Sequence, residues 1–185
     1  TVVDVEWGEG APPEQIQELL SKDTAHAYKA LCVVHNETAT GVTSDIAAVR
    51  KAMDAAKHPA LLFVDSVSGL ASIDFRMDEW KVDVAITGSQ KGFMLPAGAG
   101  IVCVSPRALE AGKGARLPRC YWSYEDMVKA NGTGYFPYTP SIPMLYGLRE
   151  PTLLHEFFEA QVERRPGKRA IEAPDGHHRP EREAQ

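Results

Sequence analysis

One lysine, flanked by Gly, Ser and Gln, stands in the stretch Thr87-Gly88-Ser89-Gln90-Lys91-Gly92-Phe93-Met94-Leu95-Pro96. The residues before it, Val82-Asp83-Val84-Ala85-Ile86, predict a buried strand, and Ile101 to Val104 predict another. Lys91 has no acidic neighbour in the sequence, and an unpaired ammonium is costly to bury. Such a lysine can act as a nucleophilic amine that forms a Schiff base, whereas most lysines at strand ends are solvated surface residues.

Outward from this stretch, apolar runs predict alternating strands and helices. Strands are predicted at residues 2–7, 30–34, 60–64, 82–86 and 100–105, with helices starting near residues 12, 46 and 106. Several strands are continuous apolar runs, which indicates a sheet covered on both faces and a three-layer α/β/α domain. Ligands of such sheets bind at the carboxyl ends of the strands, so the polar residues that follow 35, 64 and 86 are expected to meet there.

Composition limits the classes of function. The 185 residues carry a net charge of −5, which argues against a nucleic-acid partner, and their length suits one domain with a core. No run is long enough to cross a membrane, and no signal peptide is evident. The three cysteines lie far apart, which argues against a disulfide framework or a zinc site and for a cytoplasmic setting. Cys32 and Cys103 are expected in the core.

A carboxylate follows a neighbouring strand. Asp65 closes the apolar run at 60–64 and lies 26 residues before Lys91, so both are expected at the ends of adjacent strands. An ionised Asp65 could hold the ring N–H of pyridoxal phosphate and make the ring an electron sink. The alternative for Asp65 is a helix cap or a loop carboxylate.

Three motifs occur in a defined order: Glu37-Thr38-Ala39-Thr40-Gly41-Val42, Asp65-Ser66-Val67-Ser68 and Gly88-Ser89-Gln90-Lys91-Gly92. Together with Tyr138-Thr139-Pro140 and Leu145-Tyr146-Gly147-Leu148-Arg149-Glu150, they resemble the class V aminotransferases, nearest to the serine–glyoxylate and alanine–glyoxylate branch. The resemblance covers roughly residues 1 to 150, and implies part of the pyridoxal-phosphate-binding large domain of a fold-type I transferase. Transamination from serine or alanine to glyoxylate is the implied activity.

The resemblance also implies roles for individual residues. Lys91 would carry the Schiff base and move a proton during the reaction. Asp65 would pair with the ring nitrogen, and Val67 would pack against the ring face. Thr38 would lie near the ring's phenolic oxygen.

Two further roles concern the phosphate and the assembly. Gln90 would reach the phosphate of the cofactor. Thr139 would reach the phosphate bound by a partner subunit, which implies a homodimer. Cysteine desulfurases resemble this family too, but they place a His before the lysine, where this chain has Gln90.

Parts of the family pattern are missing. We expect a fragment, because no phosphate-binding turn or ring-stacking aromatic can be located before Thr1, and no arginine is assignable to the substrate carboxylate. Residues 151–165 are expected to form a helix that diverges from the family pattern, and 166–185 a disordered tail. The alternative function is therefore an inactive remnant that folds or dimerises without catalysis.

Overall fold

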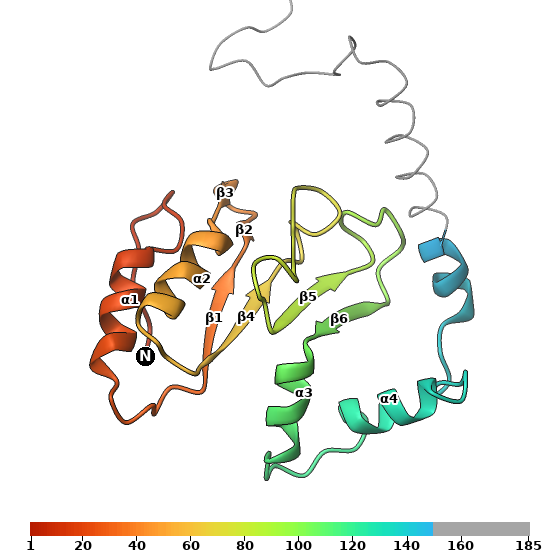
Figure 1. Ribbon diagram of the computed structural model, residues 1–185. Helices are drawn as coiled ribbons and strands as arrows, with labels where there is room; N and C mark the ends of the chain where they lie inside the picture. Colours follow the sequence, from red (N-terminus) through yellow and green to blue (C-terminus); the bar gives the residue numbers. More distant parts are fainter. Residues whose placement is uncertain (150–185) are drawn as a thin grey trace, which may run out of the picture.

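A four-stranded mixed sheet forms the centre of the computed structural model, which describes residues 1–149. Its strands are β1 (Ala30–Val34), β4 (Leu61–Asp65), β5 (Val84–Gly88) and β6 (Gly100–Val104), in the order β1-β4-β5-β6 (Figure 1). The first three are parallel, and β6 runs antiparallel to β5. The predictions for residues 151–165 and 166–185 lie outside the described residues.

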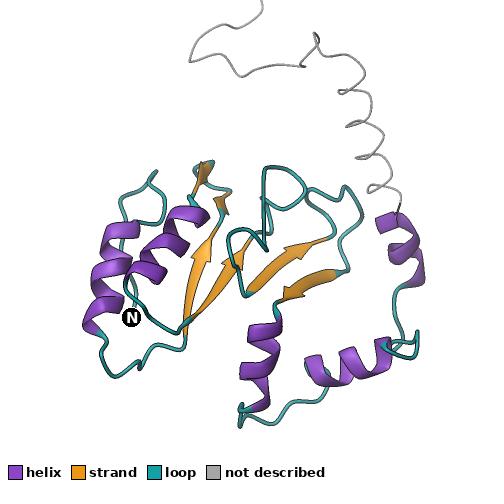
Figure 2. Ribbon diagram, in the orientation of Figure 1, coloured by secondary structure: helices purple, strands orange, loops and turns teal. Residues whose placement is uncertain are grey.

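Two helices, α1 (Pro13–Lys22) and α2 (Ile46–Ala55), cover one face of the sheet (Figure 2). α1 begins with a proline, whose missing N–H costs nothing in a first turn. α2 is capped by Asp45, whose carboxylate accepts a hydrogen bond from Ala48 N at 2.8 Å. The apolar stripes of the helices and the inward side chains of the strands form one core: Ile16, Leu20, Val33, Ile46, Val49, Met53, Leu62, Val64, Val82 and Ala85.

The opposite face of the sheet carries exposed apolar side chains. Strand register places Val34, Asp65, Ile86 and Val102 in one row on that face, and all four are exposed. Cys32 lies on the same face and is exposed, so its predicted place in the core is wrong. Cys32 is exposed because a strand is pleated: even in a continuous apolar run, every second residue lies on the side away from α1 and α2.

Cys103 differs from Cys32. Its side chain points to the helix-covered face, where it is half-buried and packs against the core. Burial raises the pKa of the Cys103 thiol.

Residues 2–7 form no strand, although a strand is predicted there: within the described chain no ladder joins them to β1, the strand at that edge of the sheet. The polar segment after His35 forms a short hairpin of β2 (Asn36–Glu37) and β3 (Val42–Thr43). Its turn ends at Gly41, which has a φ of +74° that favours glycine.

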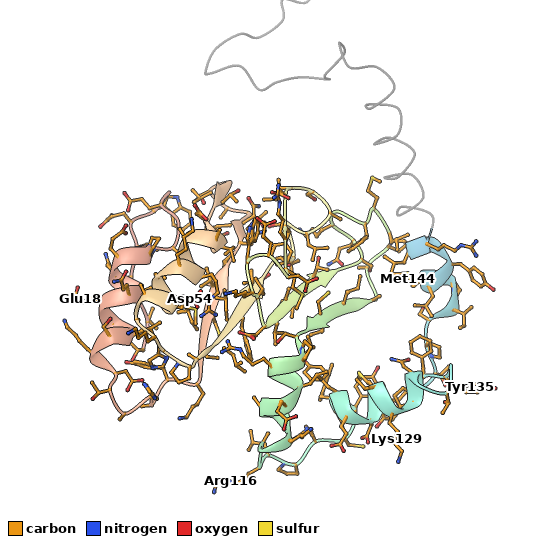
Figure 3. The ribbon with its side chains drawn as sticks, viewed as in Figure 1. Glu18, Asp54, Arg116, Lys129, Tyr135 and Met144 are labelled. Carbon is orange, nitrogen blue, oxygen red and sulfur yellow. The ribbon has the colours of Figure 1, made fainter. Side chains whose placement is uncertain are left out.

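The chain after β6 forms α3 (Pro106–Lys113) and then an arm, residues 115–149, that contains α4 (Tyr124–Asn131) and a helical segment at 142–149. α4 was not among the predicted helices; it is capped by Ser123, and none of its residues is buried, so no buried apolar stripe indicates it. Figure 3 shows Lys129, Tyr135 and Met144 along this arm.

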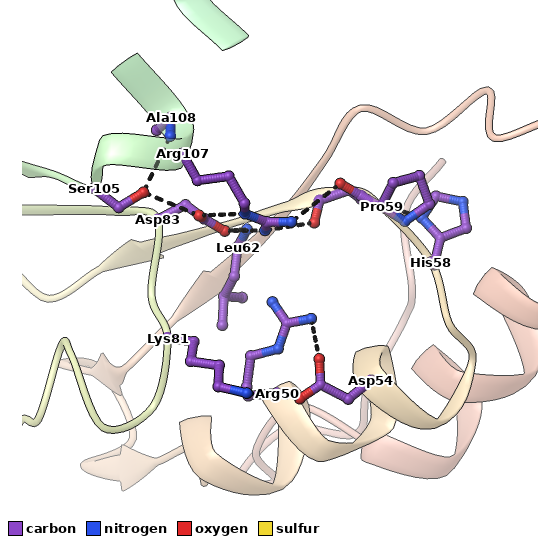
Figure 4. A network of polar contacts seen from close by, with 11 residues as sticks. Arg50, Asp54, His58, Pro59, Leu62, Lys81, Asp83, Ser105, Arg107 and Ala108 are labelled. Atoms are coloured by element: carbon purple, nitrogen blue, oxygen red, sulfur yellow. Dashed lines mark hydrogen bonds and ion pairs between the residues drawn. The ribbon is translucent and has the colours of Figure 1, made fainter. Parts of the chain in front are cut away.

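A buried carboxylate fastens the amino ends of the strands (Figure 4). Asp83 accepts hydrogen bonds from Leu62 N at 2.8 Å, from Ser105 Oγ, and from two nitrogens of Arg107. Arg107 also donates to the carbonyl of Ala60 at 3.1 Å. Burial alone would raise the pKa of Asp83, but the hydrogen bonds from Arg107 and Leu62 N outweigh it and hold that pKa below its usual range.

Candidate active site

The carboxyl ends of β4 and β5 bring Asp65 and Lys91 to the same edge of the sheet. Asp65 pairs with Ile86 in the parallel ladder, and Lys91 follows five residues later in the chain. One oxygen of Asp65, Oδ1, accepts a hydrogen bond from Val67 N at 3.0 Å, and the carboxylate is exposed. Within residues 1–149, its other oxygen and the amine of Lys91 have no hydrogen-bond or ion-pair partner. Both charged groups are therefore available to a ligand.

The loop that carries Lys91 is closed by a buried serine. Ser89 Oγ donates to Pro96 O at 2.7 Å and accepts from Ala99 N at 3.3 Å. The backbone of Ser89 adds two hydrogen bonds, to Ala99 O and from Leu95 N, both at 3.0 Å. Because these bonds span the loop, the backbone around Lys91 has a fixed shape although its side chain is exposed.

Gly92 allows this loop to lie against the turn that follows Asp65. A Cβ atom at Gly92 would lie 2.7 Å from the carbonyl carbon of Ala71 and 2.8 Å from Ser72 Oγ, and would also collide with Leu70 O. The backbones of the two loops are therefore in direct contact, and that contact fixes the position of the Lys91 loop relative to Asp65.

Hydrogen bonds join the loop after β1 to the loop after β4, and that loop to β5. Ser68 Oγ donates to Asn36 O at 2.7 Å and accepts from Asn36 Nδ2 at 3.0 Å, which links the loops after β1 and β4. Ser66 Oγ donates to Ile86 O at 2.9 Å, and Thr87 Oγ1 donates to Val67 O at 3.5 Å. Three loops therefore form one connected rim at the carboxyl end of the sheet.

The structure places the other predicted residues at different parts of this rim. Val67 is half-buried. Its N–H donates a hydrogen bond to Asp65, and its carbonyl accepts one from Thr87 Oγ1. Thr38 is exposed in the β2–β3 turn. Gln90 folds back over Gly88, where an added Cβ would lie 2.6 Å from Gln90 Oε1.

Thr139 lies on the arm and not on the rim. It is exposed, and none of the hydrogen bonds in residues 1–149 joins it to Asp65 or Lys91. The helical segment 142–149 does return beside the Lys91 loop, since a Cβ on Gly147 would lie 2.8 Å from Leu95 Cδ2. Within one chain, the structure brings the arm to the Lys91 loop, while no hydrogen bond in residues 1–149 joins Thr139 to the carboxylate or the amine.

Ser68, Ser89 and Gly92 belong to the predicted motifs, but the sequence predicted no role for any of them. The signal for Gly92 was its place directly after the lysine, because a glycine there indicates close approach of another backbone. The signal for the serines was weaker, because a polar residue in a loop is usually solvated. Their partners come from loops distant in the sequence or from the far side of the same loop.

His35 lies directly behind the rim. Its ring is buried against Phe75 and Trp80, with centroid distances of 5.2 and 6.1 Å, and Nδ1 has no hydrogen-bond partner in the described chain. Burial of the ring therefore leaves Nδ1 of His35 as an unsatisfied polar atom within the described residues. Burial lowers the pKa of His35, and the carboxylate of Asp74 opposes that shift only in part.

Acidification is expected to destabilise the rim through His35. Since its folded pKa is depressed, its stabilising contribution is complete above the unfolded value of about 6.5 and is lost as pH falls toward the folded pKa. We expect the free energy of unfolding to fall between neutral pH and mild acid, and this slope to be shallower in His35→Phe, which keeps an aromatic ring beside Phe75. Denaturant unfolding at several pH values measures this pH dependence. Equal slopes in the wild-type protein and in His35→Phe would contradict the role of His35.

Other kinds of site find no support in the part of the chain that the structure describes. Residues 1–149 contain no group of three or more His, Cys, Asp or Glu placed to hold a metal ion. None of their helices has the length and apolar character that a membrane span requires. The three cysteines are free thiols.

Comparison with known proteins gives a consistent result. The chain is 63% identical over 154 residues to the serine–glyoxylate aminotransferase of Methylorubrum extorquens, a match covering 80% of this chain and 38% of that protein. It is 56% identical over 148 residues to the L-aspartate–glyoxylate aminotransferase of Paracoccus denitrificans, covering 80% and 37%. The chain thus spans under two-fifths of the length of these curated relatives.

A solved structure agrees with the sequence matches. The aspartate aminotransferase of Thermus thermophilus superposes with a TM-score of 0.70 at 31% identity, covering 87% of this chain and 43% of that one. This match confirms the predicted α/β fold, part of the large domain of a fold-type I transferase. A family model described as Aminotransferase class-V matches residues 3–164. The chain belongs to the class V aminotransferase family.

Proposed function

We propose that this chain is part of a pyridoxal-phosphate-dependent aminotransferase that uses glyoxylate as amino acceptor and serine or alanine as donor. One observation carries the proposal: an uncommitted carboxylate and an uncommitted amine stand at the carboxyl ends of neighbouring parallel strands, β4 and β5. The names of the matched relatives support glyoxylate as acceptor. They differ in the donor, since one names serine and the other L-aspartate.

The residues present suit this cofactor. When bound, pyridoxal phosphate supplies an electron sink for the carbon that loses or gains the amino group. Asp65 offers an anionic oxygen to the ring N–H and favours the protonated ring. Lys91 supplies the amine that attaches the cofactor, and the same amine can carry a proton to and from the substrate carbon.

The remaining predicted residues complete the proposed pocket. Val67 would contact the ring face, Thr38 would lie near the phenolic oxygen, and Gln90 would reach the phosphate. Thr139 would serve the phosphate site of a partner subunit, which implies a homodimer. We also retain a cytoplasmic location, which the three free thiols support.

A second candidate function is an inactive remnant that folds or dimerises without catalysis. Its support is that no phosphate-binding turn and no arginine for the substrate carboxylate can be assigned in the sequence. Without those contacts, each worth about 1.5–3 kcal/mol for a hydrogen bond to a charged group, the cofactor would bind weakly.

Cofactor titration separates these two functions. We expect added pyridoxal phosphate to give a visible absorbance band that Lys91→Ala abolishes, because Lys91 follows the carboxyl end of β5, the strand paired with β4 at Asp65. Lys51→Ala, which removes an exposed lysine of α2, is the matched control and should keep the band. Glycine formation from glyoxylate with serine, alanine or aspartate then identifies the donor. Absence of a band at millimolar cofactor would favour the inactive remnant.

A further inference from the structure

The ring of His35 packs directly against the backbone of Gly69. Its Nδ1 atom lies 2.4 Å from the position that a Cβ at Gly69 would take, with Cε1 at 3.1 Å and Cγ at 3.3 Å. Both residues are buried, and the ring also contacts Phe75 and Trp80. A hydrogen of Gly69 therefore faces the ring nitrogen, and no larger group fits between them.

This packing requires a ring nitrogen that carries no hydrogen. In a neutral imidazole one nitrogen is a donor and the other keeps a free lone pair. Nδ1 has no partner within residues 1–149, so a proton there would create a buried N–H without an acceptor and would also need space beside Gly69. We therefore assign the proton of His35 to Nε2. The surroundings favour this neutral form, because burial lowers the pKa of His35 and the opposing carboxylate of Asp74 also pairs with Arg76 at 3.0 Å.

Gly69 connects two consecutive turns behind the rim. Its N–H donates to Ser66 O at 3.0 Å, within the turn that follows Asp65. Its carbonyl accepts hydrogen bonds from Ser72 N at 2.9 Å and from Ile73 N at 2.8 Å, within the next turn. Both turns would therefore move if Gly69 were displaced.

The second of these turns carries the contact with the Lys91 loop. Atoms of three of its residues lie 2.4–2.8 Å from the position that a Cβ at Gly92 would take: Leu70, Ala71 and Ser72. Ala71 has a φ of +65°, a left-handed conformation that persists in a residue other than glycine only where the surroundings enforce it. The turn is thus held between Gly69 on one side and Gly92 on the other.

We propose that His35 is a positioning residue for the Lys91 loop: its neutral ring fixes Gly69, and Gly69 fixes the turn against which the loop packs. The ring contacts Gly69, Phe75 and Trp80, so its effect on Lys91 passes through the backbone. Where it concerns the cofactor, this inference rests on the proposed function, in which Lys91 is the amine that holds pyridoxal phosphate.

Hydrogen exchange in the 185-residue chain without cofactor tests this role. The reporter amide is that of Leu95, which closes the Lys91 loop by donating to Ser89 O at 3.0 Å. The control amide is that of Ser105, which donates to Asp83 O at 2.8 Å, at the opposite end of the sheet. The ratio of the two exchange rates measures opening of the loop separately from opening of the whole fold.

Two variants alter the contact from its two sides. His35→Phe places a C–H group where Nδ1 meets Gly69, and Gly69→Ala places a methyl group there. Each should displace the turn and raise exchange of the reporter amide about tenfold relative to the control amide. His58→Gln is the matched control, because it replaces another buried histidine, whose Nε2 lies 3.1 Å from Asp23 Oδ2. It should leave that ratio unchanged.

The pH dependence of the ratio is a readout that a loss of stability alone would not reproduce. Protonation of Nδ1 adds a hydrogen at the same place as the C–H group of His35→Phe. In the wild-type chain the ratio should therefore rise as pH falls from neutral to below the ordinary histidine value of about 6.5, whereas in His35→Phe it should be high at every pH. Equal pH dependence in both proteins, an unchanged ratio in both rim variants, or an equal rise in His58→Gln would overturn the proposal.

Cofactor affinity keeps this inference separate from the proposed function. Pyridoxal phosphate should bind about tenfold more weakly to His35→Phe and Gly69→Ala than to the wild-type chain, and equally well to His58→Gln. If the wild-type chain gives no absorbance band, the proposed function fails, while exchange of the reporter amide still decides the role of His35. If all four proteins give the band with equal affinity, His35 does not position the amine and the proposal fails.

Discussion

Replacing Gly92 by alanine is expected to push the Lys91 loop away from the turn after Asp65. The new methyl group would overlap the backbone of Leu70 and Ala71, and backbone cannot rotate aside as a side chain can. Overpacking of this kind costs about 1–3 kcal/mol. We expect the free energy of unfolding to fall by that amount, and the affinity for pyridoxal phosphate to fall about tenfold or more.

A matched glycine serves as the control for Gly92→Ala. Gly112 lies within α3, and a Cβ there would meet nothing within 4 Å. Gly112→Ala should leave cofactor affinity unchanged and raise stability by about 0.5–1 kcal/mol, because alanine favours the helix. The interpretation of Gly92 would be wrong if both variants bound the cofactor equally well.

Replacing Asp83 by alanine is expected to give a large loss of stability. Asp83 is 3% exposed, and its removal leaves Leu62 N–H without an acceptor and Arg107 without its carboxylate. Breaking a buried pair costs about 3–5 kcal/mol, and we expect the low end of that range because the Arg107 side chain is 47% exposed. Denaturant unfolding measures the loss.

Asp74→Ala is the control for Asp83→Ala. Asp74 pairs with Arg76, but both side chains are more than half exposed, so its removal should cost well under about 1 kcal/mol. The two variants should also differ in acid. Because the folded pKa of Asp83 is depressed, its contribution is complete above the unfolded value of about 3.9 and is lost as pH falls through the folded pKa. Similar losses in both variants at neutral pH would contradict the proposed role of Asp83.

The strands of the sheet were predictable because each is an apolar run between polar or glycine-rich turns. β4 and β6 fall within a residue of their predicted bounds, and β5 is displaced by two residues. The helix α2 was equally clear, since it has both a capping aspartate and an apolar stripe. Local sequence sufficed where the period and the boundary signals agreed.

The failed predictions share a different cause. Residues 2–7 lie beside the open edge of β1 without pairing to it, and Cys32 is exposed because no described helix covers its face. Both outcomes depend on what lies beside the segment, which the local sequence does not specify.

The candidate site, like the fold, was predictable only in part. The positions of Asp65 and Lys91 at neighbouring strand ends followed from the order of the strands. The contacts that hold their loops together, from Gly92 to Leu70 and from Ser68 to Asn36, join residues over twenty positions apart. Sequence reasoning had no means of pairing them. That Lys91, Asp65, Val67, Thr38 and Gln90 line one cofactor pocket, with Thr139 serving that of a partner subunit, stays a prediction.

The closure of the Lys91 loop has a consequence for protein engineering. All four hydrogen bonds of Ser89 end within residues 95–99, and the loop is flanked by the antiparallel ladder that pairs Gly88 with Gly100. Its geometry is therefore encoded in a continuous piece of thirteen residues, 88–100. Such a piece can be grafted between two adjacent antiparallel strands of an unrelated scaffold, where it would present an exposed amine on a backbone of known shape.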